Sequence, residues 1–305
     1  MLFSKKKASK VEEPMDLESV MKKFDRESNT RIWEGKAKTV VNCVLAAFAL
    51  FCIYVTFFAT WLDAIRLSSF VGCIVLIGYL MYPAKKGVQK TNHIPWYDIV
   101  LMSAGSASFF YYTFDAMTII QQGNKFELYQ ILIGVVGILC LLELCRRCVG
   151  IPIIVVASAF IVYALIWGLT NPDILKRIEG LVGKLFYTTT SGILSTPINT
   201  CSKYIAIFII FGAFLERTGI ADFFIQISNS VVGGFSGGPA KVAVVASAME
   251  GMVSGSSVAN TVGSGSVTIP LMKRTGYKPE FAAAAEASAS TGGQIMPPIM
   301  GAAAF

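Results

Sequence analysis

Long apolar segments constrain this chain more than any other feature of its sequence. A helix needs about 20 apolar residues to cross roughly 30 Å of hydrocarbon, and Val40–Thr60, Leu128–Leu144 and Ile151–Leu169 satisfy this requirement. Leu67–Tyr82 is a shorter candidate, and Tyr97–Phe114 is a more polar one. Hydrocarbon offers the backbone no hydrogen-bond partners, so each span is predicted to be helical. We therefore expect an all-α polytopic membrane protein.

The composition supports serial membrane spans. The mean hydropathy is +0.61, with 54% hydrophobic and 15% charged residues, which lies outside the range of soluble globular domains. The net charge is +7, but the basic residues cluster beside apolar runs, where they act as orientation signals. The seven cysteines fall mostly inside apolar runs, so a disulfide framework is not expected. We expect the lipid bilayer as a partner and no nucleic acid.

Positively charged loops predict the orientation, because cytoplasmic loops carry the excess of Lys and Arg. The segment 1–39 mixes basic and acidic residues and lacks the features of a signal peptide, so it is expected to stay in the cytoplasm. The lysine-rich loop 85–90 and the Arg146–Arg147 turn also fall inside if four spans alternate within 40–147. This pattern predicts a multi-pass protein with a cytoplasmic N-terminus and a four-helix domain at 40–147.

Two amphipathic stretches are predicted beyond the fifth span. In Asn171–Asn199, apolar and charged residues recur at helical spacing, which fits either a helix lying on the membrane surface or a helix packed on the bundle. A sixth span is predicted at Tyr204–Leu215, and a second amphipathic piece at Ala221–Val232. The chain is then expected to have returned to the cytoplasmic side.

The segment from Lys241 to Arg274 reads KVAVVASAMEGMVSGSSVANTVGSGSVTIPLMKR. It contains two apolar runs, and each is too short to cross a bilayer alone. Basic residues at both ends place both ends on the cytoplasmic side, so the segment is predicted to enter the membrane and turn back as a re-entrant helical hairpin. The alternative is a small-residue packing motif between two full helices.

The predicted tip of this hairpin is rich in serine and glycine. Irregular backbone inside a membrane is tolerated only where it is buried in protein or lines a water-filled cavity. Hydroxyl, amide and freed carbonyl oxygens are ligands that Na⁺ takes from broken helices, and a helix N-terminus near Ser256 or Ser257 would favour an anion. The predicted substrate- and ion-binding residues of the tip are Ser254, Gly255, Ser256, Ser257, Asn260 and Thr261.

A second interruption follows Lys278, where paired glycines and the pair Pro297–Pro298 break an apolar run. Such residues stop a helix, and two interrupted segments in succession are typical of a transporter binding site near the bilayer midplane. The alternative is that the prolines only kink one continuous span. The predicted site residues of this broken helix are Ser290, Thr291, Gly292, Gly293, Gln294 and Pro297. A Na⁺ ion is predicted at Ser256, Asn260 and Gly292.

Two carboxylates, Glu250 and Glu286, lie inside these apolar runs. Intramembrane carboxylates are costly and usually functional, so either residue is a candidate to carry a coupling proton or to balance Na⁺. The alternative is a carboxylate satisfied by neighbouring hydroxyls or, for Glu286, by Lys278.

One stretch, GGPAKVAVVASAMEGMVSGSSVANTVGSGSVTIPLMKRTGYKPEFAAAAEASASTGGQIMPPIMGAAAF from Gly237 to Phe305, resembles the membrane permease of tripartite ATP-independent periplasmic (TRAP) transporters, in the TAXI branch. The stretches FIIFGAFLERTGIADFF (Phe208–Phe224) and GIPIIVVASAFIVYAL (Gly150–Leu165) resemble the start of the large subunit of the same family. By position, the spans of 40–147 correspond to the small subunit of fused permeases.

The resemblance implies an inner-membrane secondary transporter that imports organic acids such as C4-dicarboxylates or related carboxylates. It implies Na⁺ or H⁺ as the coupling ion, no other cofactor, and an extracytoplasmic solute-binding protein as partner. Residues 148–305 would be the N-terminal part of the large-subunit-like transport domain, with Ser254–Thr261 as the tip of its first hairpin and Ser290–Pro298 as its first broken helix. The sequence stops at Phe305 inside an apolar run, so the resemblance predicts a truncated chain without the second inverted repeat.

Two other functions would also place glycine and serine within a membrane. A channel would share the re-entrant hairpin but would repeat it around a pore. An intramembrane serine peptidase, with a nucleophile in Gly263–Ser266, would need a base beside it. The single histidine, His93, falls in a predicted cytoplasmic loop. We therefore expect no enzymatic activity and keep the channel as the alternative.

Overall fold

The computed structural model describes residues 30–84, 91–123, 125–166, 173–255 and 257–297. Every regular element within these ranges is helical, which confirms the predicted all-α fold. In the same part of the chain, four helical stretches are long and apolar enough to cross a membrane, namely Gly35–Phe57, Asp63–Met81, Leu128–Cys148 and Thr196–Leu215.

The helices have the following bounds in chain order: α2 (Gly35–Phe57), α3 (Asp63–Met81), α4 (Trp96–Gln122), α5 (Leu128–Cys148), α6 (Ile151–Ile166), α7 (Ile174–Val182), α8 (Thr196–Thr200), α9 (Ala206–Arg217), α10 (Ile220–Val232), α11 (Gly238–Ser254), α12 (Ser257–Gly263), α13 (Gly265–Arg274) and α14 (Pro279–Gly292). Two wider π-helical turns, η1 (Gly183–Tyr187) and η2 (Cys201–Ile205), and one 3₁₀ turn, η3 (Gly293–Ile295), continue α7, α8 and α14.

Most predicted spans are confirmed as helices, with shifted ends. Helix α4 runs beyond the predicted Tyr97–Phe114 as far as Gln122, and within it Tyr111 donates to the Asp115 carboxylate at 2.8 Å. Helix α6 covers Ile151–Ile166, and residues 167–169 of the predicted fifth span lie outside the described residues. The predicted sixth span is the end of a longer helical stretch formed by α8, η2 and α9.

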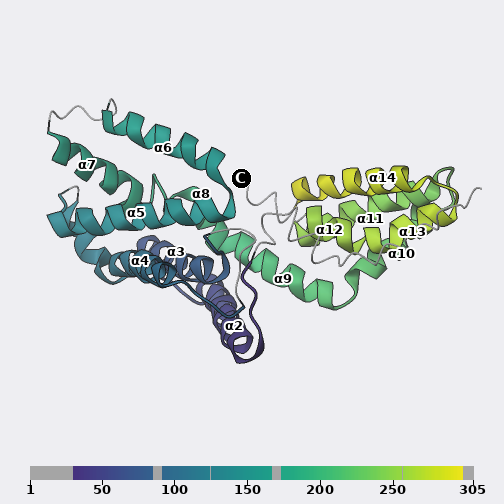
Figure 1. Ribbon diagram of the computed structural model, residues 1–305, viewed down its shortest axis with the longest axis horizontal. Coiled ribbons are helices and arrows are strands. Elements are labelled where there is room, and N and C mark those ends of the chain that lie inside the picture. The colour runs from purple at the N-terminus through teal and green to yellow at the C-terminus, as the bar shows by residue number, and fades with distance from the viewer. Residues whose placement is uncertain (1–29, 85–90, 124, 167–172, 256, 298–305) are drawn as a thin grey trace, which may run out of the picture.

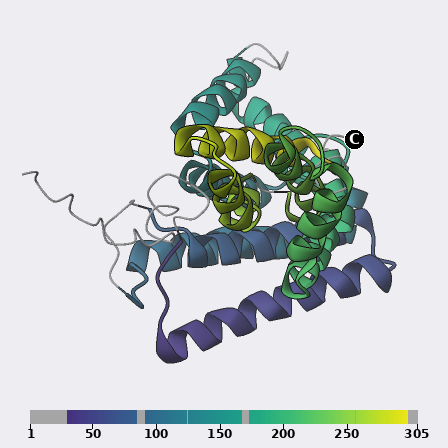
Figure 2. The same cartoon turned by 90° about the vertical axis from the view of Figure 1, so that its right-hand side faces the viewer.

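The helices form two bundles joined by α9 (Figure 1). The N-terminal bundle contains α2 to α8, and the C-terminal bundle contains α10 to α14. Helix α9 packs against α2 on one side and against α11 on the other. In the second view, α2 (purple) lies along the lower edge of the molecule, with the C-terminal helices (green to yellow) above it (Figure 2).

Glycines allow the helices of the N-terminal bundle to approach closely. A Cβ on Gly105 of α4 would lie 2.9 Å from the Cβ of Cys140 on α5, and a Cβ on Gly137 of α5 would lie 2.4 Å from a ring carbon of Phe186. Small residues at such contacts are typical of helix packing in membranes, where close van der Waals contact replaces the hydrophobic effect.

Part of the first amphipathic stretch, from Val182 to Tyr187, packs on the N-terminal bundle. Val182, Phe186 and Tyr187 are buried against α5, whereas Leu175 at the start of α7 is exposed. Tyr112 of α4 donates to the backbone carbonyl of Tyr187 at 2.7 Å, and the Tyr187 hydroxyl donates to the carbonyl of Gln130 at 2.7 Å. Of the two alternatives for Asn171–Asn199, packing on the bundle is therefore confirmed for Val182 to Tyr187.

A buried ionic cluster closes one end of the N-terminal bundle. Asp98, in the first turn of α4, forms ion pairs with Arg31, which precedes α2, and with Arg147, in the last turn of α5, at 2.7 Å. All three side chains are almost fully buried. Arg147 also lies over the Tyr79 ring, with its guanidinium carbon 4.7 Å from the ring centroid. The cluster thus fixes the chain before α2 to the ends of α4 and α5.

Replacing Asp98 by Asn should destabilise the protein strongly. The change removes the counter-charge of the buried Arg31 and leaves Arg147 with Glu143 as its ionic partner, and removing one partner of a buried ion pair costs about 3–5 kcal/mol. Titrating the purified protein in mixed micelles with a denaturing detergent measures the free energy of unfolding. The control is Asp173→Asn, whose exposed pair with Lys176 spans 3.5 Å and should contribute less than about 1 kcal/mol. Equal effects of the two substitutions would contradict this assignment.

Candidate functional site

The predicted hairpin is confirmed as a helical hairpin. Helix α11 forms the first arm, and α12 and α13 form the second, which folds back and packs along α11 (Figure 1). The second arm is divided at Ser264, because glycines on both sides of it, Gly263 and Gly265, weaken the helix. Ser264 itself keeps helical dihedral angles, so α12 and α13 stay joined through a short irregularity.

The turn at the tip depends on Gly255. Helix α11 ends at Ser254, and Gly255 follows with φ +63° in the left-handed region, its N–H donating to the carbonyl of Gly251 at 3.1 Å. Glycine adopts this conformation without steric cost. Helix α12 then begins at Ser257 as predicted. Ser256, a predicted ligand, lies outside the described residues.

The second interruption begins within the predicted stretch Ser290–Pro298. Helix α14 runs through Ser290 and Thr291 to Gly292, becomes 3₁₀ at Gly293–Ile295 and ends before Pro297. Its serine and threonine do not break it, because Thr291 donates its hydroxyl to the carbonyl of Ala287 at 2.8 Å within the helix. Helix α14 therefore ends at Gly292, inside the predicted stretch, and Ser290 and Thr291 at the start of that stretch are still helical.

The structure brings the two interruptions together. The Gln294 amide donates to the Ser257 hydroxyl at 3.0 Å. A Cβ on Gly251 would lie 2.3 Å from the Cα of Gly293, and a Cβ on Gly293 would lie 2.6 Å from the Asn260 amide nitrogen. Only glycine permits this approach of α11 to η3. The hairpin tip and the end of the broken helix thus form one site.

Asn260 is the most informative residue of this site. Its side chain is fully buried, and its amide nitrogen donates to the backbone carbonyl of Ser247 at 2.8 Å. Its amide oxygen, Oδ1, is buried without a hydrogen-bond partner in the described part of the chain. Leaving a buried acceptor unpaired costs about 1–3 kcal/mol, so such an atom calls for an explanation. A cation or a donor from a ligand would supply the missing partner.

Glu286 of α14 lies at the centre of a buried hydroxyl cluster next to Asn260. Its Oε1 atom is 2.5 Å from the Ser264 hydroxyl, 3.1 Å from that of Ser247 and 3.2 Å from that of Ser290. Its Oε2 atom accepts from Thr268 at 2.5 Å. Within the described residues, no ion pair joins Glu286 to Lys278 or to any other base. Hydroxyls therefore satisfy this carboxylate.

Ser247 links Asn260 to this cluster, which we define as Ser247, Ser264, Thr268, Glu286 and Ser290. Its carbonyl accepts from Asn260, and its hydroxyl lies within hydrogen-bond distance of Glu286. Three members of the cluster, Ser247, Ser264 and Thr268, were not predicted as site residues. Their spacing could have indicated them. Ser264 and Thr268 are four residues apart, so they lie on the same face of a helix, and hydroxyls on an apolar helix are suited to face a buried carboxylate such as Glu286.

The remaining predicted residues lie around this centre. The Glu250 carboxylate packs against α12, because a Cβ on Gly263 would lie 2.1 Å from its Oε1 atom. Thr261 donates its hydroxyl to the carbonyl of Ser257 at 2.7 Å, within the helix. Gly292 has open space where a side chain would be, and Thr291 and Pro297 are exposed. None of these last residues has a hydrogen bond to the cluster in the part of the chain that the structure describes.

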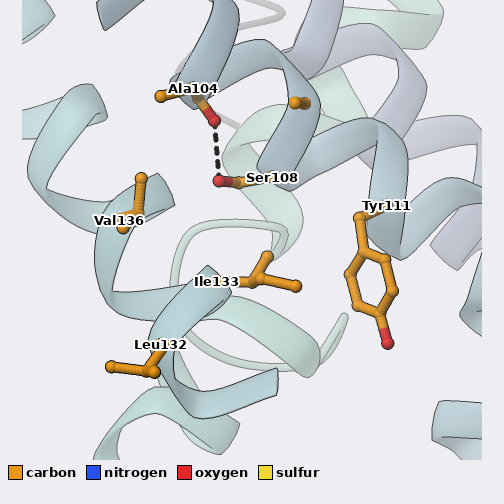
Figure 3. A pocket seen from close by; sticks show the side chains of 7 residues that line it. Ala104, Ser108, Tyr111, Leu132, Ile133 and Val136 are labelled. Atoms are coloured by element: carbon orange, nitrogen blue, oxygen red, sulfur yellow. Dashed lines mark hydrogen bonds between the residues drawn. The ribbon is translucent and has the colours of Figure 1, made fainter. Parts of the chain in front are cut away.

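A groove between α4 and α5 is a weaker candidate for a binding site. It has a volume of about 370 Å³ and an apolar lining. The Ser108 hydroxyl on its wall is already bonded to the carbonyl of Ala104 at 2.8 Å (Figure 3). Tyr111 is bonded to Asp115 at 2.8 Å. With its polar groups used, this groove has the chemistry of a surface that faces lipid. No group of three or more His, Cys, Asp or Glu side chains able to hold a metal occurs in the described residues.

Comparisons with known proteins agree with this architecture. The family described as "Tripartite ATP-independent periplasmic transporter, DctM component" matches residues 136–305. The C4-dicarboxylate TRAP transporter large permease protein DctM of Vibrio cholerae is 40% identical over 94 residues, which are 31% of this chain and 21% of that protein. The protein of the same name from Pseudomonas aeruginosa is 35% identical over 130 residues, which are 43% of this chain and 28% of that protein.

The chain thus spans well under a third of the length of the curated relatives that it matches. No solved structure matches it with significance. The family match covers more than half of the chain, including the hairpin, the hydroxyl cluster and the broken helix. As the sequence resemblance predicted, this chain belongs to the family of the DctM component of tripartite ATP-independent periplasmic transporters.

Proposed function

We propose that this chain belongs to a membrane permease that imports organic acids, such as C4-dicarboxylates or related carboxylates, by secondary transport. Membership of the DctM family supports a transporter permease. The name of the relatives, C4-dicarboxylate TRAP transporter, supports the substrate class. An extracytoplasmic solute-binding protein is the partner that would deliver the substrate, since the family is tripartite and periplasmic.

The observation that carries this proposal is the unpartnered Oδ1 atom of Asn260 where the two interruptions meet. Intramembrane sites of secondary transporters use broken helices, whose freed carbonyls coordinate a coupling ion. The site offers hard oxygen ligands, which are the type that Na⁺ prefers. We propose Na⁺ as the coupling ion, held by Asn260 together with Ser256 and the backbone around Gly292. No cofactor beyond the ion is proposed.

Glu286 is the residue proposed to balance the charge of this ion. Ser247 connects it to Asn260, so a negative charge on Glu286 acts on the ion site through one intervening residue. If H⁺ rather than Na⁺ is the coupling ion, Glu286 is the group that would carry it. Glu250 is the second candidate, because its carboxylate lies beside α12.

The N-terminal bundle is proposed to have the role of the small permease subunit, with residues 40–147 fused to a large-subunit-like domain at 148–305, as in the TAXI branch. We propose the bacterial inner membrane as its location, with segment 1–39 in the cytoplasm. Among the alternatives, a channel lacks support from the family match. A serine peptidase is disfavoured because Ser264 is fully buried and bonded within the cluster.

Replacing Asn260 by Ala in the complete permease should raise the Na⁺ concentration for half-maximal uptake. Interactions with a charged group contribute about 1.5–3 kcal/mol, so the increase should be about tenfold to a hundredfold. Uptake of labelled dicarboxylate into proteoliposomes with the binding protein present measures this value. The control is Thr275→Ala, which removes an exposed hydroxyl bonded only to backbone carbonyls at the end of α13. An unchanged Na⁺ dependence for Asn260→Ala would remove this residue from the ion site.

Replacing Glu286 by Gln should abolish coupled uptake while preserving the fold. Gln has nearly the same shape and can bond to the surrounding hydroxyls, but it carries no charge and cannot hold a coupling proton. We expect uptake to fall at least tenfold and the unfolding temperature to change little. Glu280→Gln, at an exposed carboxylate in the first turn of the same helix, is the matched control and should transport normally. Full uptake by Glu286→Gln would assign the cluster a purely structural role.

Both ends of the hairpin should be accessible from the cytoplasm. Single cysteines at Lys241 and Lys273, in a background without the seven native cysteines, would be labelled with a membrane-impermeant thiol reagent in inside-out and right-side-out vesicles. Labelling of both positions only in inside-out vesicles is the expected result for a re-entrant hairpin. Labelling from opposite sides would show one continuous span and would contradict the orientation proposed here.

A further inference from the structure

A cavity of about 360 Å³ opens where α3, α5 and α6 meet at one end of the N-terminal bundle. Its lining includes Ala84, after α3, the arginines Arg146 and Arg147 at the end of α5, and Gly150 and Ile151 at the start of α6. We propose that this cavity binds the phosphate-bearing headgroup of an anionic phospholipid. The inference is independent of the transport function proposed above.

The first argument is an excess of positive charge around the cavity. Three arginines, Arg31, Arg146 and Arg147, share two carboxylates, Asp98 and Glu143. The nearly buried Arg147 is bonded to both carboxylates, which leaves Glu143 as the sole ionic partner of Arg146 in the described structure. One positive charge therefore remains uncompensated among these five side chains.

The second argument is the availability of Arg146. Its side chain is 39% exposed, and it bonds to Glu143 through Nε at 2.7 Å and through one terminal nitrogen, Nη2, at 2.8 Å. No described residue accepts from its other terminal nitrogen, Nη1. A guanidinium presents planar donors that match phosphate oxygens, and bonds of this kind are the strong ones in proteins. Arg146 can therefore hold Glu143 and a phosphate at the same time.

The third argument is the surface next to the cavity. Helix α6 starts at its rim and has no buried residue, and its large apolar side chains, such as Ile153, Val155 and Phe160, are more than half exposed. An apolar surface of this kind needs a cover. A phospholipid provides an anionic head for Arg146 and acyl chains for α6 in one molecule. Basic pockets between helix ends on the cytoplasmic side are known to bind anionic headgroups by the same combination.

The test is selective lipid binding by the purified full chain. The protein is placed in nanodiscs of phosphatidylcholine with an increasing fraction of phosphatidylglycerol, and the lipids retained after extraction into neutral detergent are counted by native mass spectrometry. We expect retained phosphatidylglycerol with the unaltered protein. Arg146→Gln should weaken its binding about fivefold, because one basic residue near a membrane surface contributes about 1 kcal/mol to the attraction of anionic lipid.

Matched variants separate the cavity from general charge effects. Arg274→Gln removes the same charge from an exposed position in the last turn of α13 and should retain phosphatidylglycerol as the unaltered protein does. Arg146→Lys keeps the charge and should bind better than Arg146→Gln. Thermal unfolding in pure phosphatidylcholine checks that Arg146→Gln is folded, as expected since Arg147 still pairs with Glu143.

Three outcomes would overturn the proposal. The first is equal retention of phosphatidylglycerol by Arg146→Gln and Arg274→Gln. The second is retention of phosphatidylcholine at the same level as phosphatidylglycerol. The third is displacement of the lipid by inorganic phosphate at millimolar concentration, since this would identify a site for free phosphate instead of a membrane lipid.

Discussion

A carboxylate removed from water must be hydrogen-bonded. The Glu286 carboxylate is therefore surrounded by hydroxyl groups from α11, α13 and α14 and from the junction of α12 and α13. Ser247 brings in α11, Ser264 the junction of α12 and α13, Thr268 the body of α13, and Ser290 the same helix as Glu286. Every element of the hairpin is thereby tied to α14. The position of Asn260 and the meeting of the two interruptions depend on this arrangement.

Close backbone contacts act together with the hydroxyl cluster to hold the helices of the C-terminal bundle together. Gly251 and Gly293 let α11 and η3 touch, and Gly263 makes room for the carboxylate of Glu250. These contacts do not depend on the hydrophobic effect, which is weak between helices surrounded by lipid. Shape and hydrogen bonding therefore position the site. The small residues of this segment make these close approaches possible.

Features that depend on the local sequence, such as the spans and the hairpin turn, could be predicted. Side-chain contacts between residues distant in the sequence could not. Span length and composition predicted α2, α3 and α5, and Gly255 predicted the turn of the hairpin. No local pattern indicates that Arg31 pairs with Asp98 across 67 positions. Nor could it show which hydroxyls surround Glu286, since helical phase and packing together select Ser247 and Thr268. Nor could the exact end of α14 within the predicted stretch be read from its serine and threonine, because their hydroxyls can bond within a helix.

The anchored amide of Asn260 limits how the hairpin can rearrange. Its nitrogen is held by the Ser247 carbonyl, so the side chain cannot turn to pair its buried Oδ1 atom without losing another bond. An unpaired buried acceptor costs about 1–3 kcal/mol, so the packing of α11, α12 and η3 carries this cost. A group that paired with Oδ1 only in this packing would stabilise the packing by the same free energy by which the packing strengthens its binding. The binding of such a group and the rigidity of the hairpin would then be two measures of one equilibrium.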